Sequence, residues 1–137
     1  GLSSEGAALA GLRILVVDDE IDSRNFVVFV LEQEQAEVMA LSSASEALYE
    51  LEQYNPDVLL TDIGMPDMDG YMLIRQVRTR SPEQGGQVVA IALTAYASDY
   101  DQQQTLEAGF EHHLAKPIEP DELIKTIAAL TRKTSNG

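Results

Sequence analysis

Short apolar runs and longer segments with helical periodicity alternate along the chain. RILVV (residues 13–17) and VVAIALT (88–94) are compact apolar runs of strand length, which is typical of strands buried on both faces. SASEALYELEQ (43–53) begins with a capping box of Ser43 and Glu46 and continues with an apolar stripe, which indicates a helix. The same signals predict strands at 13–17, 38–41, 57–61, 88–94 and 112–116, and helices at 22–35, 43–53, 71–80, 98–109 and 120–131.

The spacing of apolar residues also predicts which side of each helix is buried. The fourth helix is poor in apolar residues, with Leu106 as its main anchor after Tyr100, which favours a segment of low local stability. In the first three helices we expect these side chains to face the core: Phe26, Phe29, Val30, Ala44, Ala47, Leu48, Leu51, Leu73, Ile74 and Val77.

Five strand and helix units in succession predict the fold class. Alternation at this spacing favours right-handed crossovers, a mostly parallel sheet and helices on both of its faces. The segment SPEQGG (81–86) is expected to be a loop. We expect one domain over residues 12–131, a flexible N-terminal linker over 1–11 and a flexible C-terminal tail over 132–137.

Polar residues stand at the ends of four of the predicted strands. Asp18 and Asp19 follow the first strand and Asp62 follows the third. Thr94 stands at the end of the fourth strand and Lys116 at the end of the fifth. Because open parallel sheets collect their chemistry at the carboxyl ends of their strands, these side chains are expected to meet in one crevice.

Composition and charge narrow the classes of protein. The chain has 137 residues, 45% of them hydrophobic, and no cysteine, which excludes disulfides, thiol catalysis and Cys-ligated zinc. Nine basic residues against 23 acidic ones give a net charge of -14, which disfavours direct binding to nucleic acid or to an anionic membrane. The start of the chain has no basic segment ahead of its apolar residues, and no apolar stretch has the length of a membrane span. We therefore expect a cytoplasmic domain.

Four segments of the chain resemble a known family. LVVDDE (15–20), LLTDIGMPDMDGY (59–71), ALTAYA (92–97) and LAKP (114–117) are similar to the signature segments of receiver domains in two-component response regulators. The resemblance covers roughly residues 12–131. It implies a flavodoxin-like (βα)5 fold, a three-layer sandwich whose five parallel strands have the order 2-1-3-4-5. It also implies transfer of a phosphoryl group from a phosphohistidine to Asp62.

The resemblance implies a metal site around the same aspartate. Three ionised carboxylates in one crevice would repel each other, so a divalent cation is expected, and Mg²⁺ suits oxygen ligands. In the arrangement of the family, Asp19 and Asp62 bind Mg²⁺ directly and Asp18 acts through a coordinated water. The backbone carbonyl of Gly64 supplies a further oxygen, and Mn²⁺ is an alternative ion.

The remaining signature residues have implied roles around the phosphoryl group. Lys116 would bind a phosphoryl oxygen, the Lys116–Pro117 peptide bond would be cis, and the hydroxyl of Thr94 would donate to another oxygen. Tyr96 could partly cover the crevice. In the family, a threonine and an aromatic residue then switch the surface formed here by 98–109, 112–116 and 120–131.

The implied switch has one departure in this chain. His113 occupies the place of the usual switch aromatic, which leaves its part in switching open. An imidazole there could add pH sensitivity, or it could be an ordinary strand residue. The same surface is a candidate for a weak homodimer.

The resemblance also implies partners and limits the expected activity. The partner would be the dimerisation and phosphotransfer domain of a histidine kinase, or an Hpt protein. No substrate turnover is expected beyond the chain's own phosphorylation and autodephosphorylation. The segments 83–97 and 109–117 are similar to receivers at the carboxyl end of hybrid histidine kinases, and a single-domain regulator fits equally well.

Three other classes of protein are alternatives to a receiver. A flavin- or nucleotide-binding domain would have a Gly-rich turn after the first strand, where this chain has the acidic sequence DDE. A haloacid-dehalogenase-like phosphatase would have its two aspartates two residues apart after the first strand, whereas Asp18 and Asp19 are adjacent. A degenerate receiver that binds partners without being phosphorylated would lack key residues of the phosphorylation site, and this chain has all of those.

Overall fold

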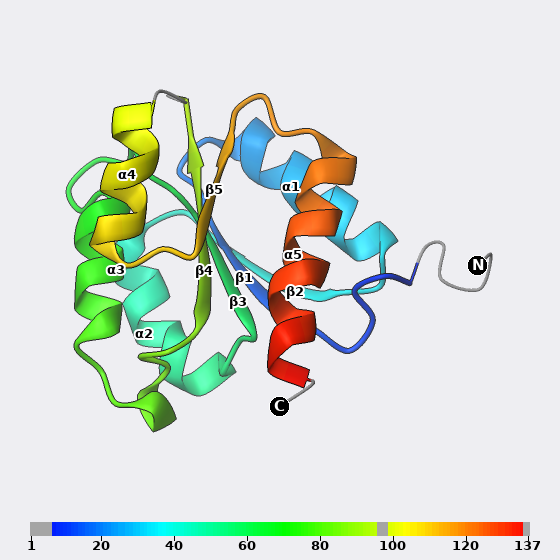
Figure 1. Ribbon diagram of the computed structural model, residues 1–137, viewed down its shortest axis with the longest axis horizontal. Helices are drawn as coiled ribbons and strands as arrows, with labels where there is room; N and C mark the ends of the chain where they lie inside the picture. Colours follow the sequence, from blue (N-terminus) through cyan, green and yellow to red (C-terminus); the bar gives the residue numbers. More distant parts are fainter. Residues whose placement is uncertain (1–6, 96–98, 136–137) are drawn as a thin grey trace.

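The computed structural model describes residues 7–95 and 99–135 of the chain (Figure 1). Strands and helices alternate as the sequence predicts. Their bounds are β1 (Arg13–Val17), α1 (Ile21–Gln33), β2 (Glu37–Leu41), α2 (Ala44–Tyr54), β3 (Val58–Asp62), α3 (Gly70–Arg78), the 3-10 turn η2 (Pro82–Gln84), β4 (Val89–Thr94), α4 (Asp99–Ala108), β5 (His112–Ala115) and α5 (Pro120–Ser135).

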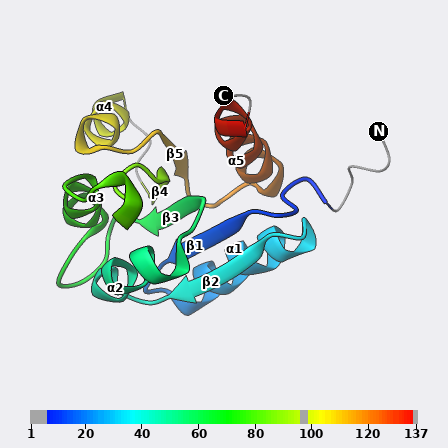
Figure 2. The same ribbon diagram turned by 90° about the horizontal axis from the view of Figure 1, so that it is seen from below.

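All four pairings between neighbouring strands are parallel, and the order across the sheet is β2-β1-β3-β4-β5. This confirms the predicted flavodoxin-like fold and its strand order. Helices α1 and α5 cover one face of the sheet, and α2, α3 and α4 cover the other (Figures 1 and 2). Because side chains alternate along a strand, Leu15 and Val17 of β1 pack toward one layer of helices while Ile14 and Val16 pack toward the other.

The predicted core faces of α2 and α3 are largely confirmed. Ala44, Ala47 and Leu51 of α2 are buried, and Leu48 packs at the edge of the same cluster. In α3 the three expected residues, Leu73, Ile74 and Val77, are fully or almost fully buried. Each helix has polar residues on its other side, so its sequence admits a single orientation on the sheet.

The predicted core face of α1 is wrong for two of its three residues. Phe26 is 44% exposed and Phe29 is 60% exposed, whereas Val30 is buried as expected. The helix instead packs through Val27, Val30 and Leu31. Apolar residues occur around most of α1, so the spacing alone did not distinguish the side that packs on the sheet from the side that faces outward.

The predicted anchor of α4 is also wrong. Leu106 is 54% exposed, and among the side chains of this helix that the structure describes, the small ones of Thr105 and Ala108 pack inward. A helix that lies close to its neighbour favours small residues in the contact, and apolarity alone does not reveal them. The side chain of Tyr100 and the predicted helix start at Ser98 lie outside the described residues.

The predicted limits of the domain are too narrow at both ends. Within the expected linker, Leu9 is fully buried against the α1 side of the sheet, and its N–H donates to the carbonyl of Glu34 at 3.1 Å. Helix α5 continues to Ser135, beyond the expected start of the tail at 132. Residues 1–6 and 136–137 lie outside the described part of the chain. Within the described residues, each helix is too short or too polar to cross a lipid bilayer.

Candidate functional site

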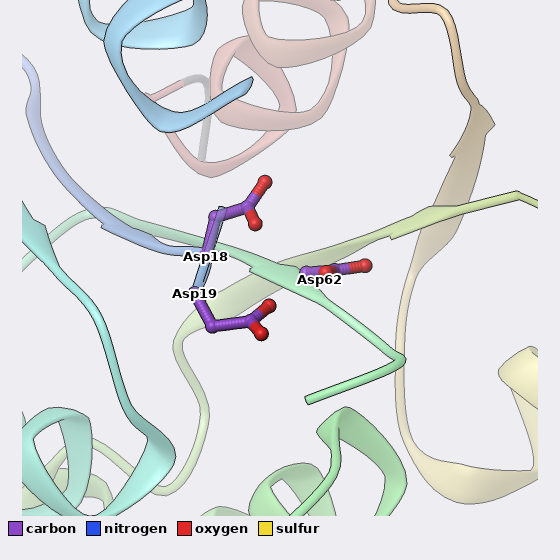
Figure 3. Close-up of side chains that lie close together, drawn as sticks. All are labelled: Asp18, Asp19 and Asp62. Atoms are coloured by element: carbon purple, nitrogen blue, oxygen red, sulfur yellow. The ribbon is translucent and has the colours of Figure 1, made fainter. Parts of the chain in front are cut away.

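Three carboxylates meet at the carboxyl ends of β1 and β3. Asp62 is the last residue of β3 and Asp18 follows β1 directly. The two strands are neighbours with Val17 beside Thr61, so Asp18 and Asp62 start from the same level of the sheet. Figure 3 shows the side chains of Asp18, Asp19 and Asp62 lying close together at this edge of the sheet. One carboxylate oxygen from each of the three residues lies within 4.8 Å of the other two.

The three acids differ in their exposure to water. Asp18 is fully buried, Asp62 is 8% exposed and Asp19 is exposed. One oxygen of Asp18 accepts a hydrogen bond from the N–H of Glu20 at 2.9 Å. A buried carboxylate needs such donors or a nearby cation, because the loss of hydration is costly.

The lack of a side chain at Gly70 lets the start of α3 lie against the backbone of Asp62. A Cβ at Gly70 would lie 2.6 Å from the carbonyl oxygen of Asp62, so no other residue fits there without a shift of the backbone. The N–H of Gly70 donates to the carbonyl of Ile63 at 2.9 Å, and Asp69 caps α3 by accepting from the N–H of Met72. Gly64 lies in the same turn and has open space where a side chain would start.

Lys116 provides the positive charge at this site. Its Nζ lies 3.2 Å from Oδ2 of Asp18 and 3.5 Å from Oδ1 of Asp62. The peptide bond between Lys116 and Pro117 is cis, in agreement with the expectation from the sequence. Burial by itself lowers the pKa of Lys116, but the charges of Asp18 and Asp62 raise it overall. Lys116 is therefore held as an ammonium ion between two carboxylates.

Asp62 has a raised pKa. Burial is the main cause, while the charge of Lys116 acts in the opposite direction. The charge of Asp18 raises the pKa further, and a backbone hydrogen bond at Gly64 lowers it. The raised pKa indicates that the carboxylate is incompletely compensated by the groups around it.

Thr94 lies beside this group, and His113 belongs to the neighbouring strand. Thr94 ends β4 and is buried, and its backbone carbonyl accepts from the N–H of Lys116 at 2.8 Å. His113 is half-buried in β5 beside Ala92 of β4. Burial is the first cause of its lowered pKa, and the charge of His112 lowers it further. Tyr96, the expected cover, lies outside the described residues.

A groove that the sequence did not predict lies next to Lys116. It has a volume of about 590 Å³ and is lined by Glu20, Asp22, Ser23, Phe26, Lys116, Pro117 and Ile118. Ile21 and Phe29, which are both exposed, lie on the same helix. The sequence signal for this surface is the excess of large apolar residues on α1, two of which, Phe26 and Phe29, are predicted in the core.

The group of acids suits a hard divalent cation. Within residues 7–95 and 99–135, Asp18, Asp19 and Asp62 form the one acidic group close enough to share a metal ion. All of the candidate ligands are oxygen atoms, and oxygen ligands are those that Mg²⁺ prefers. The residues present therefore fit an Mg²⁺ site.

Comparison with known proteins decides the family. The family model described as "Response regulator receiver domain" matches residues 14–128. The chain belongs to the response regulator receiver domain family. This receiver domain is 46% identical over 119 residues to an uncharacterized 14.6 kDa protein of Leptolyngbya boryana, with 87% of this chain and 89% of that protein covered. It is 34% identical to the two-component response regulator PhoP of Pseudomonas aeruginosa, where the match covers 90% of this chain and 53% of that protein. The chain thus spans about half the length of PhoP.

Solved structures agree with this assignment. The receiver domain of Francisella response regulator 1452 superposes with a TM-score of 0.83 at 28% identity, over 90% of this chain and 99% of that one. The receiver domain of a sensor histidine kinase from Pseudomonas aeruginosa PAO1 has a TM-score of 0.76 at 33% identity, over 87% of this chain and 95% of that one. That structure holds a magnesium ion coordinated in its active-site cleft.

Proposed function

We propose that this receiver domain accepts a phosphoryl group on Asp62 in an Mg²⁺-dependent reaction. The observation that carries the proposal is the convergence of three carboxylates and one ammonium group at the ends of β1, β3 and β5. The phosphoryl donor is a phosphohistidine, on the dimerisation and phosphotransfer domain of a histidine kinase or on an Hpt protein. The reaction takes place in the cytoplasm.

In the transfer step, the phosphoryl group moves from a histidine nitrogen to an oxygen of Asp62. An Oδ atom of Asp62 attacks phosphorus and forms a P–O bond, and the P–N bond to the imidazole breaks. Its electron pair stays on the ring nitrogen, and the histidine leaves as a neutral imidazole when its other nitrogen carries the proton. Water later attacks phosphorus and breaks the P–O bond, which releases phosphate and restores the carboxylate of Asp62.

The surroundings of Asp62 explain why it is the acceptor. Asp18 is fully buried and lies 3.2 Å from Lys116, and Asp19 is exposed, whereas Asp62 ends β3, lies 3.5 Å from Lys116 and has a pKa that burial raises. Mg²⁺ bound by Asp19, Asp62 and the carbonyl of Gly64, with Asp18 acting through a water molecule, would neutralise the charge that develops during transfer. Mn²⁺ can take the same place.

Lys116 and Thr94 stabilise the phosphoryl group in this proposal. Lys116 already reaches the edge of Asp62 at 3.5 Å, so its ammonium is placed to bind a phosphoryl oxygen as a point charge. The Thr94 side chain comes from the strand next to β3, and its hydroxyl can donate to a second oxygen. Movement of Thr94 toward the phosphoryl group would then alter the surface of α4, β5 and α5, where His113 replaces the usual aromatic residue.

The groove beside Lys116 is the surface where the donor protein would dock. It adjoins the exposed apolar residues of α1 and borders the reacting carboxylate through Lys116. Acidic Glu20 and Asp22 line the groove as well, which favours a partner with an apolar helical face and basic residues around it. A phosphohistidine on such a helix could reach Asp62.

Incubation with acetyl phosphate and Mg²⁺, followed by intact mass measurement, tests the proposal. The wild-type chain is expected to gain the mass of one phosphoryl group, and Asp62→Asn is expected to gain none. Asp67→Asn is the matched control, because Asp67 is an exposed acid in the turn after β3. An adduct that survives Asp62→Asn would contradict the proposal, and an adduct that forms equally well in EDTA would contradict its metal requirement.

A further inference from the structure

One arginine of α1 contacts the backbone between the two adjacent acids. Arg24 is half-buried in the first turn of the helix, and its Nη1 donates to the carbonyl oxygen of Asp18 at 2.8 Å. That carbonyl belongs to the peptide group that joins Asp18 to Asp19. A planar peptide moves as one unit, so a hydrogen bond to its oxygen restrains the directions of both side chains.

The backbone before this peptide is restrained from the other side. The N–H of Asp18 donates to the carbonyl of Leu41 at 3.1 Å, which fixes the end of β1 against β2. The start of α1 has no side-chain cap, since Glu20 at the N-cap position makes no such bond. Arg24 therefore adds a restraint on the turn between β1 and α1, through the carbonyl of Asp18, at a helix start that no side chain caps.

We propose that Arg24 is a positioning residue, which holds the Asp18–Asp19 peptide so that the carboxylates converge with Asp62 on a divalent cation. The inference rests on the proposed Mg²⁺ requirement of the site. Arg24 does not touch the metal or the phosphoryl group in this account. It acts by fixing the orientation of the Asp18 and Asp19 side chains.

The direction in which removal of Arg24 changes Mg²⁺ affinity distinguishes a positioning role from a purely electrostatic one. Arg24 is a cation close to an acidic site, so its field alone opposes the binding of Mg²⁺. Removal of a purely electrostatic arginine would make Mg²⁺ bind more tightly. Removal of a positioning arginine should make Mg²⁺ bind more weakly, because the carboxylates must then be ordered by the metal itself.

The test compares Mg²⁺ affinity among variants of the full chain, by NMR titration of backbone amides without any phosphoryl donor. Arg24→Met should raise the dissociation constant of Mg²⁺ about tenfold, which is the scale of one hydrogen bond from a charged donor. Arg24→Lys keeps the charge and one donor group, so its loss should be smaller. Arg75→Met removes the same charge from an exposed position on α3 and should leave the affinity unchanged.

Two further readouts keep the outcomes distinct. The metal-free amide signals of Asp19 and Glu20 should shift in Arg24→Met but not in Arg75→Met, and thermal unfolding reports any general loss of structure. If Arg24→Met does not fold, the Mg²⁺ affinity of Arg24→Lys is compared with that of the wild-type chain instead. Unchanged or tighter Mg²⁺ binding in the folded Arg24 variants would overturn the role of Arg24.

The wild-type chain separates this inference from the proposed function. A wild-type chain that binds no Mg²⁺ would overturn both this role and the metal requirement. A wild-type chain that binds Mg²⁺ but forms no adduct with acetyl phosphate would contradict phosphorylation alone, and the variants would still decide the role of Arg24.

Discussion

Asp62 is held between groups that act on its pKa in opposite directions. Burial is the larger influence and raises the pKa above its ordinary value of 3.8, while Lys116 lowers it. A carboxylate in this condition is available to react or to bind a cation, because its environment leaves its charge only partly satisfied. Asp18 next to it is buried completely and has an ammonium partner at 3.2 Å.

Asp62 should make stability depend on pH in the metal-free protein. The folded state binds the proton of Asp62 more tightly than the unfolded state, since the folded pKa is raised. Stability therefore falls as the pH rises through the interval between 3.8 and the raised pKa, and the loss persists above it. Asp62→Asn removes this effect, so in EDTA the variant should gain stability relative to wild type as the pH rises through that interval. Urea unfolding across the pH range measures the difference, and a constant or opposite difference would contradict the assignment.

Lys116 should matter for stability as well as for chemistry. Its removal leaves the fully buried carboxylate of Asp18 without a cation, so Lys116→Met should cost about 2 kcal/mol in EDTA. Mg²⁺ should restore part of that loss by supplying positive charge to the same carboxylates. Urea unfolding with and without Mg²⁺ measures both effects. Lys125→Met, at an exposed position on α5, is the control, and equal stability of the two variants in EDTA would refute the expectation.

At the scale of elements, α1 has two different faces. One face packs into the core through Val27, Val30 and Leu31. The other carries two exposed phenylalanines, of which Phe26 lines the groove at Lys116. Large exposed apolar side chains that gather next to a reactive site mark an interaction surface. The pattern of apolar residues predicts the helix correctly but does not identify its packed side, because apolar residues occur around most of α1, and the prediction of Phe26 and Phe29 in the core is therefore wrong.

Substitution of these phenylalanines should separate docking from chemistry. Phe26→Ser and Phe29→Ser should slow transfer from a histidine kinase that phosphorylates the wild-type chain, by roughly tenfold, because apolar anchors dominate interfaces. Phosphorylation by acetyl phosphate should stay unchanged, because that donor needs no docking surface. Leu106→Ser changes a similarly exposed apolar residue on α4 and is the control. Equal losses with both donors would show that the substitutions damage the site itself.

At the scale of the whole molecule, the sheet unites residues that are far apart in the chain. Asp18 and Lys116 are separated by 98 positions and meet because β1, β3, β4 and β5 are parallel and end at the same edge. The domain that supports this edge is also larger than the predicted range, since Leu9 is buried with residues of α1 and α5. The turn before β1 therefore contributes to the core rather than only leading into it.

Leu9 provides a direct test of this larger domain. Leu9→Ala should lower the free energy of unfolding by about 2 kcal/mol or more, because it removes a buried side chain and leaves a cavity. Leu106→Ala shortens an exposed leucine and should change stability by less than about 0.5 kcal/mol. Guanidinium unfolding monitored by circular dichroism measures both. Equal effects of the two substitutions would show that Leu9 adds nothing to the core, as expected if the segment before β1 were only a linker.

The sequence by itself determined the succession of strands and helices, the parallel direction of the strands and the identity of the residues at the strand ends. These follow from local periodicity and from the rules that connect neighbouring elements, so nearby residues carry the necessary information. Only the tertiary structure decided which side of α1 is packed, which small residues anchor α4, and that Arg24 reaches the peptide between Asp18 and Asp19. Those outcomes depend on how close separate elements lie and on which side chains fit between them, and neither is written in the period of any one segment.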